Sequence, residues 1–167
     1  GYDSRYFLEL NFGYNGSENF TPKRRYGFFP SVGLGWAISE ERFFEPLSDV
    51  FDLLKLRVSH GKVGNSQIDG DRRFAYITTI DTKTGYNFGR ERNNSWDGLN
   101  VGEYGVDVTW ETALKSNLGI DVYAWNNSLN LQFDVFKERR EGIFLRRGNV
   151  PAYVGLQSLP FGNLGII

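Results

Sequence analysis

Acidic side chains are the residues of this chain that could carry out acid–base chemistry. Glycoside hydrolysis needs two carboxyl groups about 5 to 9.5 Å apart, and Asp121, Asp134 and Glu138 lie close enough in sequence to supply such a pair. If this region forms strands, these positions fall on a polar face, and a wet surface accounts for their charge without catalysis. We therefore predict that the chain is not an enzyme.

Ligands for a metal or a cofactor are scarce. Asp69-Gly70-Asp71 could contribute to a calcium loop, but the twelve-residue spacing and the bidentate glutamate are missing. Cysteine is absent and His60 is the only histidine, which excludes thiolate sites and leaves a Ser-His-Asp triad without clear partners. Gly33 and Gly35 are not followed by the helix of a dinucleotide fingerprint. We predict no metal and no cofactor.

Aromatic side chains in a long polar segment are the candidates for ligand binding. The segment from residue 66 to residue 105 is rich in Asp, Asn, Arg and Gly, and loops of this length are usually functional or disordered. Four of its aromatic residues could stack on sugar rings while their polar neighbours bind hydroxyl groups: Tyr76, Tyr86, Trp96 and Tyr104. The same side chains could instead pack the segment on itself or contact a partner protein.

The charge balance does not support nucleic-acid binding. The 167 residues include 19 basic and 20 acidic side chains, with a formal net charge of -1 and no long run of either sign. Aromatic residues make up 16% of the chain and hydrophobic residues 40%, so we expect an ordered structure. No stretch has the pattern of a transmembrane helix or a signal peptide.

Long strands are the elements that must position these residues. From Trp110 to Lys137 apolar and polar residues alternate, and the alternation restarts after Asn126-Asn127, which predicts an antiparallel hairpin. From Leu114 to Ala124, at roughly 3.3 Å per residue and a tilt near 40°, the first arm rises about 28 Å, enough to cross a lipid core. We expect the apolar sides of 114–124 and 129–135 to face lipid. The polar side is expected to face a water-filled lumen: Asn117, Asp121, Asn130 and Asp134.

The same alternation predicts three earlier strands, over residues 5–14, 26–38 and 53–62. Pro30 interrupts the second of them, and because proline cannot donate to a ladder we expect a bulge there. Ser39 is expected to cap a short helical turn that ends at Pro46. Beyond Arg140 scattered glycine and proline predict no further strand. The fold class is therefore all-β, an antiparallel meander of about five long strands that forms part of a large transmembrane β-barrel.

Short and long connections alternate between the two ends of this meander. The Asn126-Asn127 turn and the compact segment 39–52 lie at one end, and the long segments 15–25 and 66–105 lie at the other. Short periplasmic turns and long extracellular loops are typical of outer-membrane barrels. Aromatic residues near the predicted strand ends are interpreted as an interface girdle: Phe28, Trp36, Phe43, Phe44, Trp110 and Trp125.

Three segments resemble the SusC/RagA family of TonB-dependent outer-membrane transporters. They are Phe29-Pro30-Ser31-Val32-Gly33-Leu34-Gly35-Trp36 with Ile38-Ser39-Glu40-Glu41; Leu54-Lys55-Leu56-Arg57-Val58-Ser59-His60-Gly61 with Gly64-Asn65; and Trp110-Glu111-Thr112 with Asn117-Leu118-Gly119-Ile120-Asp121. His60 departs from the pattern, because the family more often has a tyrosine there.

The resemblance implies a location in the outer membrane of a Gram-negative bacterium and a barrel of about twenty-two strands with a plugged lumen. Residues 1–167 would be a fragment of the barrel domain, without the plug domain. Such transporters import glycan or peptide oligomers, and their implied partners are TonB, a SusD-like surface lipoprotein and membrane lipid.

The leading hypothesis is therefore a transporter segment that supplies barrel wall and extracellular loops. The alternative is a soluble all-β carbohydrate-binding module that uses the aromatic segment as its platform. A glycoside hydrolase fragment is a third and weaker option. The transporter segment and the soluble carbohydrate-binding module both predict strands with a period of two, so periodicity does not separate these two hypotheses.

Overall fold

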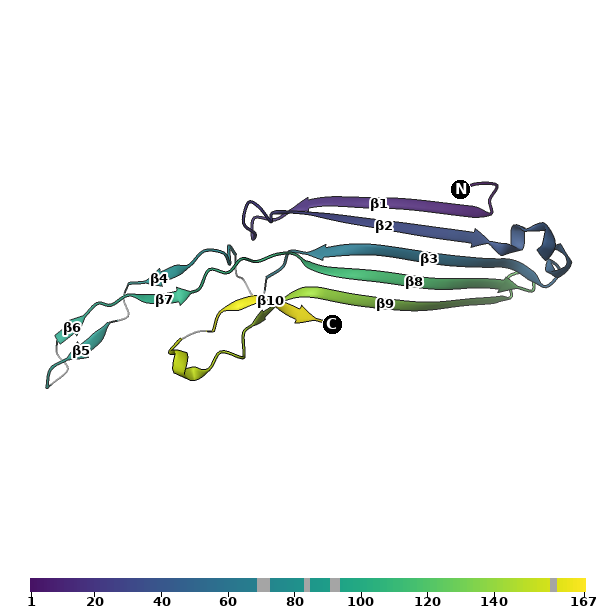
Figure 1. The fold of residues 1–167 in the computed structure, drawn as a ribbon. Coiled ribbons are helices and arrows are strands. Elements are labelled where there is room, and N and C mark those ends of the chain that lie inside the picture. Colours follow the sequence, from purple (N-terminus) through teal and green to yellow (C-terminus); the bar gives the residue numbers. More distant parts are fainter. Residues whose placement is uncertain (69–72, 83–84, 91–93, 157–158) are drawn as a thin grey trace.

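The computed structural model of the chain is dominated by one antiparallel sheet (Figure 1). The structure describes residues 1–68, 73–82, 85–90, 94–156 and 159–167. Six strands pair in the order β1-β2-β3-β8-β9-β10. Their bounds are β1 Tyr6–Gly16, β2 Tyr26–Ala37, β3 Phe51–Asn65, β8 Glu111–Ala124, β9 Leu129–Arg146 and β10 Phe161–Ile166. The prediction of an all-β antiparallel meander is confirmed, with a sixth strand added.

Two of the strands are longer than predicted. β3 begins at Phe51 and ends at Asn65, and β9 continues past Lys137 through a highly charged stretch. Ion pairs join this stretch to β8: Lys115 Nζ lies 3.3 Å from Glu138, and Arg140 Nη1 lies 3.8 Å from Glu111. Opposite charges on neighbouring strands stabilise a sheet, so a sequence rich in charge remains part of the ladder.

The prediction that no strand follows Arg140 is wrong. β10 pairs antiparallel with β9, and the register shifts on both sides of Gly165. A bulge moves side chains from one face of a strand to the other, so the period of two is lost in a strand of only six residues. Between β9 and β10 lies a short 3₁₀ helix, η3 (Ala152–Val154).

The bulge predicted at Pro30 is absent. Pro30 lies opposite Phe12 in an unbroken register between β1 and β2. Pairing of β2 with β3 starts at the next residue, Ser31. Pro30 therefore lies just beyond the end of the ladder between β2 and β3. A proline is tolerated at such a position, because its missing N–H group leaves no unmade bond in the interior of that ladder.

The predicted role of Ser39 as a helix cap is also wrong. Two short 3₁₀ helices follow β2, η1 (Ile38–Glu40) and η2 (Arg42–Leu47), and Ser39 lies inside the first. Their N-cap residues are Ala37 and Glu41, and neither cap makes a side-chain hydrogen bond. Pro46 lies within η2 instead of ending it, because the fixed φ of proline near −65° suits a 3₁₀ turn.

An extended arm lies between β3 and β8, where the sequence predicted a long loop. β4 (Thr79–Asp81) pairs with β7 (Asn100–Glu103), and β5 (Tyr86–Phe88) pairs with β6 (Asn94–Trp96). The two small ladders follow one another along the arm, which projects beyond the end of the six-stranded sheet (Figure 1). Strands of three or four residues are too short for a periodicity to be recognised.

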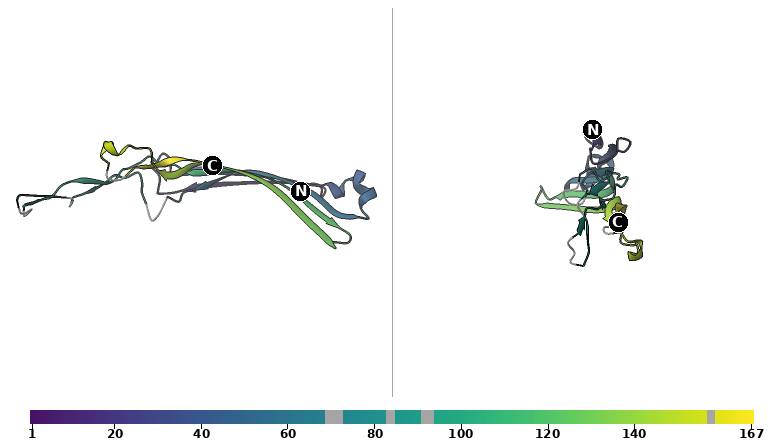
Figure 2. Two further views of the ribbon diagram at one scale, coloured as in Figure 1. Left: turned by 90° about the horizontal axis from the view of Figure 1, so that it is seen from below. Right: turned by 90° about the vertical axis from the view of Figure 1, so that its left-hand side faces the viewer.

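The six-stranded sheet is a single curved layer (Figure 2). The main cluster of buried apolar residues lies where the arm joins the sheet, and its members come from loops and strand ends: Phe20, Ile68, Val108 and Phe144, with Ala75, Val106, Trp110 and Phe161 packed around them. Packing therefore stabilises the end of the sheet next to the arm. At the opposite end Phe44 is buried and contacts Phe51 edge-to-face, while the middle of both faces is open. Among the described residues, no helix has the length and apolar composition needed to span a membrane.

Candidate functional site

One face of the sheet carries apolar side chains that lie in register on five neighbouring strands. Two adjacent rows are Leu8, Leu34, Val58, Leu118 and Val135, and Tyr6, Trp36, Leu56, Ile120 and Phe133. Many of these side chains are exposed, and Phe133 is 66% exposed. Soluble monomers rarely expose an apolar surface of this extent, whereas a barrel wall presents one to lipid. We call this surface the outer face.

The apolar residues of the outer face form a band that runs obliquely to the strands. The band covers Tyr6–Tyr14 on β1 and Leu129–Val135 on β9, and the register places Val135 level with Leu8 and Phe133 level with Tyr6. One edge of the band lies at Val135 on β9, level with Leu8, but at Tyr14 on β1, so it shifts by six residues over four strand steps. The other edge lies at Tyr6 on β1, level with Phe133, but at Leu129 on β9, so it shifts by four residues. At roughly 3.3 Å per residue and 4.8 Å per strand, this corresponds to a strand tilt of about 35–45°. Outer-membrane barrels have the same tilt.

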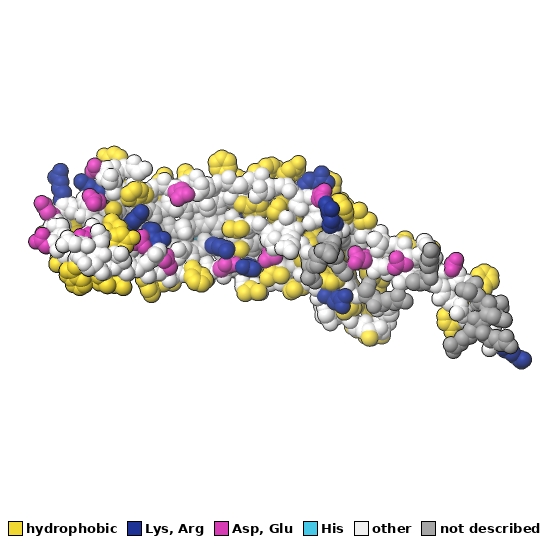
Figure 3. Space-filling view, turned by 180° about the vertical axis from the view of Figure 1, so that it is seen from behind, with side chains coloured by type: hydrophobic (Ala, Val, Ile, Leu, Met, Phe, Trp, Pro, Cys, Tyr) yellow, Lys and Arg dark blue, Asp and Glu magenta, His cyan; other side chains and the backbone are white. Residues whose placement is uncertain are grey.

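A charged network occupies the centre of the opposite face, which we call the inner face. Arg57 on β3 donates from Nε and Nη2 to the two carboxylate oxygens of Asp121, at 2.8 and 2.9 Å. Arg57 Nη2 also lies 3.3 Å from Asp134 Oδ1, which accepts a second bond of 3.1 Å from Asn117 Nδ2. In the view from behind, basic and acidic side chains lie next to one another over the middle of the sheet (Figure 3).

Gly119 allows this network to cross from one strand to the next. The register places Gly119 between Arg57 on β3 and Asp134 on β9. A Cβ atom at Gly119 would lie 2.5 Å from Asp134 Oδ1 and 2.8 Å from Arg57 Nη2. Because glycine has no side chain, the guanidinium group can lie over β8 and contact carboxylates on two strands.

The acidic residues considered for catalysis are all engaged in ion pairs. Asp121 and Asp134 contact Arg57, and Glu138 contacts Lys115 and Arg140. All three carboxylates therefore take part in contacts between neighbouring strands. The arrangement is that of a wall whose charges are paired with one another.

His60 lies on the outer face, where its Nδ1 is 2.8 Å from Ser116 Oγ. The residues that the structure describes include no group of three or more histidine, aspartate or glutamate side chains placed to hold a metal ion. Asp69 and Asp71, the candidates for a calcium loop, lie outside the described residues.

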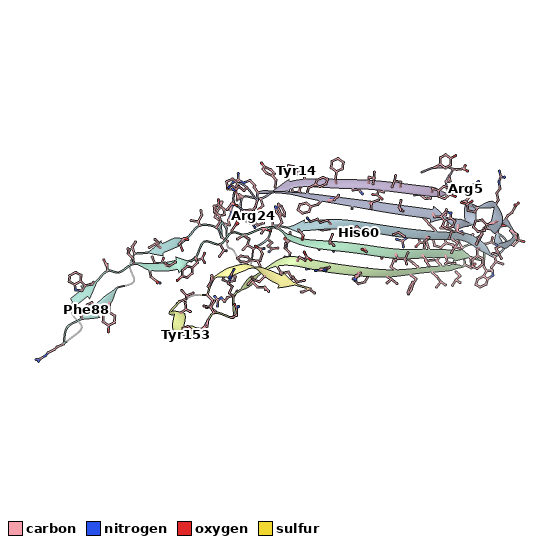
Figure 4. The ribbon with its side chains drawn as sticks, viewed as in Figure 1. Arg5, Tyr14, Arg24, His60, Phe88 and Tyr153 are labelled. Carbon is pink, nitrogen blue, oxygen red and sulfur yellow. The ribbon has the colours of Figure 1, made fainter. Side chains whose placement is uncertain are left out.

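Two of the four aromatic candidates lie opposite each other in the distal part of the arm. Tyr86 on β5 pairs directly with Trp96 on β6, and the two side chains are 71% and 68% exposed. Phe88 contacts Tyr86 edge-to-face, with 5.0 Å between the ring centroids. Figure 4 shows Phe88 far out along the arm from Tyr14 and Arg24, which mark the end of the sheet. These rings form an open aromatic surface that could stack on a ligand.

The other two candidates, Tyr76 and Tyr104, are half-buried. Tyr76 meets Phe74 edge-to-face at 6.2 Å between the centroids, and Tyr104 lines a small hollow together with Phe144 and Phe161. The structure therefore separates the four predicted residues into an exposed pair and a packed pair, and does not bring them together in one platform.

The aromatic residues predicted for the interface girdle divide in a similar way. Phe28, Phe43 and Trp125 are exposed. Phe44 is buried, and Trp110 packs against Phe20 and Phe29 with both centroid distances at 5.1 Å. The contacts of these two rings join segments that are separate in the sequence, so the alternation did not reveal that they pack against other aromatic side chains.

Asn163 on β10 ties the base of the arm to the sheet, a contact that the sequence analysis missed together with β10. Its Oδ1 accepts the N–H of Thr109 at 2.9 Å, and its Nδ2 donates to the carbonyls of Thr109 at 2.9 Å and Gly142 at 2.6 Å. Gly142 has a φ of +74°, a conformation that glycine adopts without strain. The amide side chain thus takes the place of a backbone partner.

Comparison with curated proteins finds TonB-dependent receptors. "TonB-dependent receptor P39" of Formosa agariphila is 33% identical over 153 residues, which is 90% of this chain and 14% of the relative. "TonB-dependent receptor P3" of the same organism is 28% identical over 158 residues, covering 94% of this chain and 15% of the relative. "TonB-dependent receptor SusC" of Bacteroides thetaiotaomicron is 25% identical over 162 residues, covering 97% and 16%. No protein-family model matches.

Comparison with solved structures supports the same fold. The structure of the RagAB peptide transporter matches with a TM-score of 0.78 and 24% identity, covering 99% of this chain and 17% of that chain. The RagAB peptide importer in its 'closed-closed' state matches with a TM-score of 0.79 and 23% identity, over the same shares. This chain spans about a sixth of the length of the proteins it matches.

Proposed function

We propose that this chain supplies wall strands and extracellular loops to a transporter. The premise is that it corresponds to a partial segment of a SusC/RagA-type TonB-dependent receptor in the outer membrane of a Gram-negative bacterium. Residues 1–167 are then part of the barrel domain. The outer face contacts lipid, and the inner face, with its paired charges, lines the lumen.

The observation that carries this proposal is the oblique apolar band on a sheet of one layer. A soluble β module buries its apolar face against a second layer, and no second sheet covers the outer face within the part of the chain that the structure describes. The tilt of about 35–45° derived from the band suits a membrane barrel. The alternative of a soluble carbohydrate-binding module accounts for neither feature.

The cargo of the complete receptor is proposed to be an oligomeric nutrient, either a glycan or a peptide. The name of RagAB identifies a peptide transporter among the matched structures. The exposed rings of Tyr86 and Trp96 could stack on a sugar or on an apolar peptide side chain. A SusD-like surface lipoprotein and TonB are the proposed protein partners, and we propose that the arm contacts the lipoprotein or the cargo outside the membrane.

One pair of substitutions tests the orientation of the wall in the full-length receptor. Phe133→Lys places a cation within the apolar band and should cost about 2–4 kcal/mol near the bilayer midplane. Gln132→Lys makes the same change one residue away on the inner face, opposite Asp121. We expect Phe133→Lys to reduce the amount of assembled barrel that migrates as a folded species on unheated SDS gels. Gln132→Lys should leave it unchanged, and equal behaviour of the two variants would contradict the proposal.

A further inference from the structure

Three cations on the outer face lie just beyond the apolar band. On β3 the outward positions that follow Val58 are His60 and Lys62, and on β9 those that follow Val135 are Lys137 and Arg139. We call Lys62, Lys137 and Arg139 the outer basic cluster. All three lie on the surface that continues the lipid-facing wall.

The register brings the outer basic cluster together across β8. Lys62 lies opposite Leu114, which lies opposite Arg139, and His60 lies opposite Ser116, which lies opposite Lys137. The contact of 2.8 Å between His60 and Ser116 places their side chains on one face. Lys62 and Arg139 are therefore two strand spacings apart, roughly 10 Å. Side chains as long as lysine and arginine can meet over that distance.

The charges of this cluster are largely uncompensated, unlike those of the inner face. Lys62 and Lys137 make no ion pair with any side chain that the structure describes, and Arg139 pairs with Glu141 at 2.8 Å. On the inner face, by contrast, Lys115 and Arg140 both contact Glu138. Two positive charges therefore remain available on the outside of the wall.

The cluster lies at the extracellular end of the membrane. The arm and the connection between β1 and β2 leave the sheet at that end, whereas a turn of four residues, 125–128, joins β8 to β9 at the other. Short turns are periplasmic and long loops extracellular in these barrels. The outer basic cluster is therefore level with the headgroups of the outer leaflet.

We propose that the outer basic cluster binds a phosphate group of a phosphorylated glycolipid in the outer leaflet. Cations next to a lipid-facing surface attract anionic headgroups, and charge-assisted bonds from lysine and arginine to phosphate are short and strong. A hollow of about 720 Å³ beside Lys62 is also lined by Lys23, Arg24 and Glu141, and Arg24 pairs with Asp107 at 2.9 Å. Phe28, Phe29 and Trp110 also line this hollow, which therefore has both polar and aromatic surfaces for the sugars that carry the phosphate. The inference rests on the membrane placement of the wall and goes beyond transport.

The test measures binding of purified bisphosphorylated lipid A to the delipidated full-length receptor in mild detergent, by native mass spectrometry. The variant Lys62→Gln/Lys137→Gln removes the two unpaired cations. The control variant Lys55→Gln/Lys115→Gln removes two inner-face cations from β3 and β8. At about fivefold per cation next to an anionic headgroup, we expect lipid A binding to weaken about twenty-five-fold in the first variant and to stay unchanged in the control.

Two further probes identify what is bound. Dephosphorylated lipid A should bind the wild-type receptor as weakly as bisphosphorylated lipid A binds the variant, and inorganic phosphate should not compete at millimolar concentration. Equal binding of both lipids, equal binding by both variants, or full competition by inorganic phosphate would each overturn the proposal.

A measurement on the unmodified receptor covers the case in which the variant does not assemble. Binding of bisphosphorylated lipid A to the wild type should weaken severalfold as salt rises from about 0.05 to 0.5 M, because screening reduces attraction between exposed charges. Salt-independent binding would contradict the proposal. A receptor that passes the Phe133→Lys test but fails these tests would keep its proposed function and lose only the lipid site.

Discussion

Removing the charge of Arg57 should loosen the sheet where β3, β8 and β9 meet. The substitution Arg57→Met keeps most of the aliphatic stem and removes the guanidinium group. It leaves two carboxylates, those of Asp121 and Asp134, without the cation that joins them.

The expected size of the effect follows from the contacts. Arg57 makes two bonds to Asp121, at 2.8 and 2.9 Å, and weaker contacts to Asp134, at 3.3 and 3.4 Å. Loss of a hydrogen bond to a charged group costs about 1.5–3 kcal/mol. The Arg57 side chain is 32% exposed and that of Asp121 16%, so water screens part of this loss. We expect a cost of about 2 kcal/mol, equivalent to roughly thirtyfold in an equilibrium constant.

Hydrogen exchange measured by mass spectrometry on the full-length receptor in detergent would detect this local change. Peptides from 51–65 and 111–124 should exchange about thirtyfold faster in Arg57→Met, while peptides from the arm keep their rates. Adding Asp121→Asn and Asp134→Asn to Arg57→Met should restore part of the protection, because no unpaired carboxylate remains. Unchanged exchange in Arg57→Met, or no recovery in the triple variant, would refute the reasoning.

Two further predictions concern the distal part of the arm and the connection between β2 and β3. The double substitution Tyr86→Ala/Trp96→Ala in the full-length receptor should weaken binding of an oligosaccharide or peptide cargo about tenfold, as measured by calorimetry. The control Tyr104→Phe should leave the affinity unchanged. An equal loss of affinity in both variants would argue against a binding role for Tyr86 and Trp96. Hydrogen bonds from Tyr6 Oη at 2.5 Å and Trp36 Nε1 at 3.2 Å lower the pKa of Glu41. Its stabilising effect is therefore present above the usual carboxyl pKa and is lost as the pH falls through the lowered value. Glu41→Gln should speed hydrogen exchange in 38–47 at pH 7, and the difference from the wild type should shrink as the pH is lowered, after correction for intrinsic rates. A difference that does not change with pH would contradict this.

The faces of the long strands could be predicted from the sequence because alternation survives wherever one side is apolar. Leu118 and Asp121 fall on the two sides expected of them. The partners of each residue were less accessible, since contacts such as Arg57 with Asp121 depend on the register between strands distant in sequence. Gly119 gave no sign of its role, because its importance comes from the space it leaves under a side chain from another strand.

The missed elements were those in which the period of two breaks down. β10 was missed because its register shifts at Gly165, and the small ladders of the arm because they are short. Of the aromatic candidates, sequence proximity grouped four residues that the structure divides, since Tyr104 packs near Phe161 while Trp96 lies farther out along the arm. Tertiary packing, and not residue type, decides which of these rings remains open.

The oblique course of the apolar band also has a consequence for how a complete barrel closes. A drift of about five residues over four strand steps means that a line drawn perpendicular to the strands climbs like a screw thread. After a full circuit it returns to the starting strand displaced by a fixed number of residues, the shear, which must be a whole number for the hydrogen bonds to meet. A slip of register between β3 and β8 would therefore change the shear and misalign the hydrogen bonds between the two strands that close the barrel on its far side.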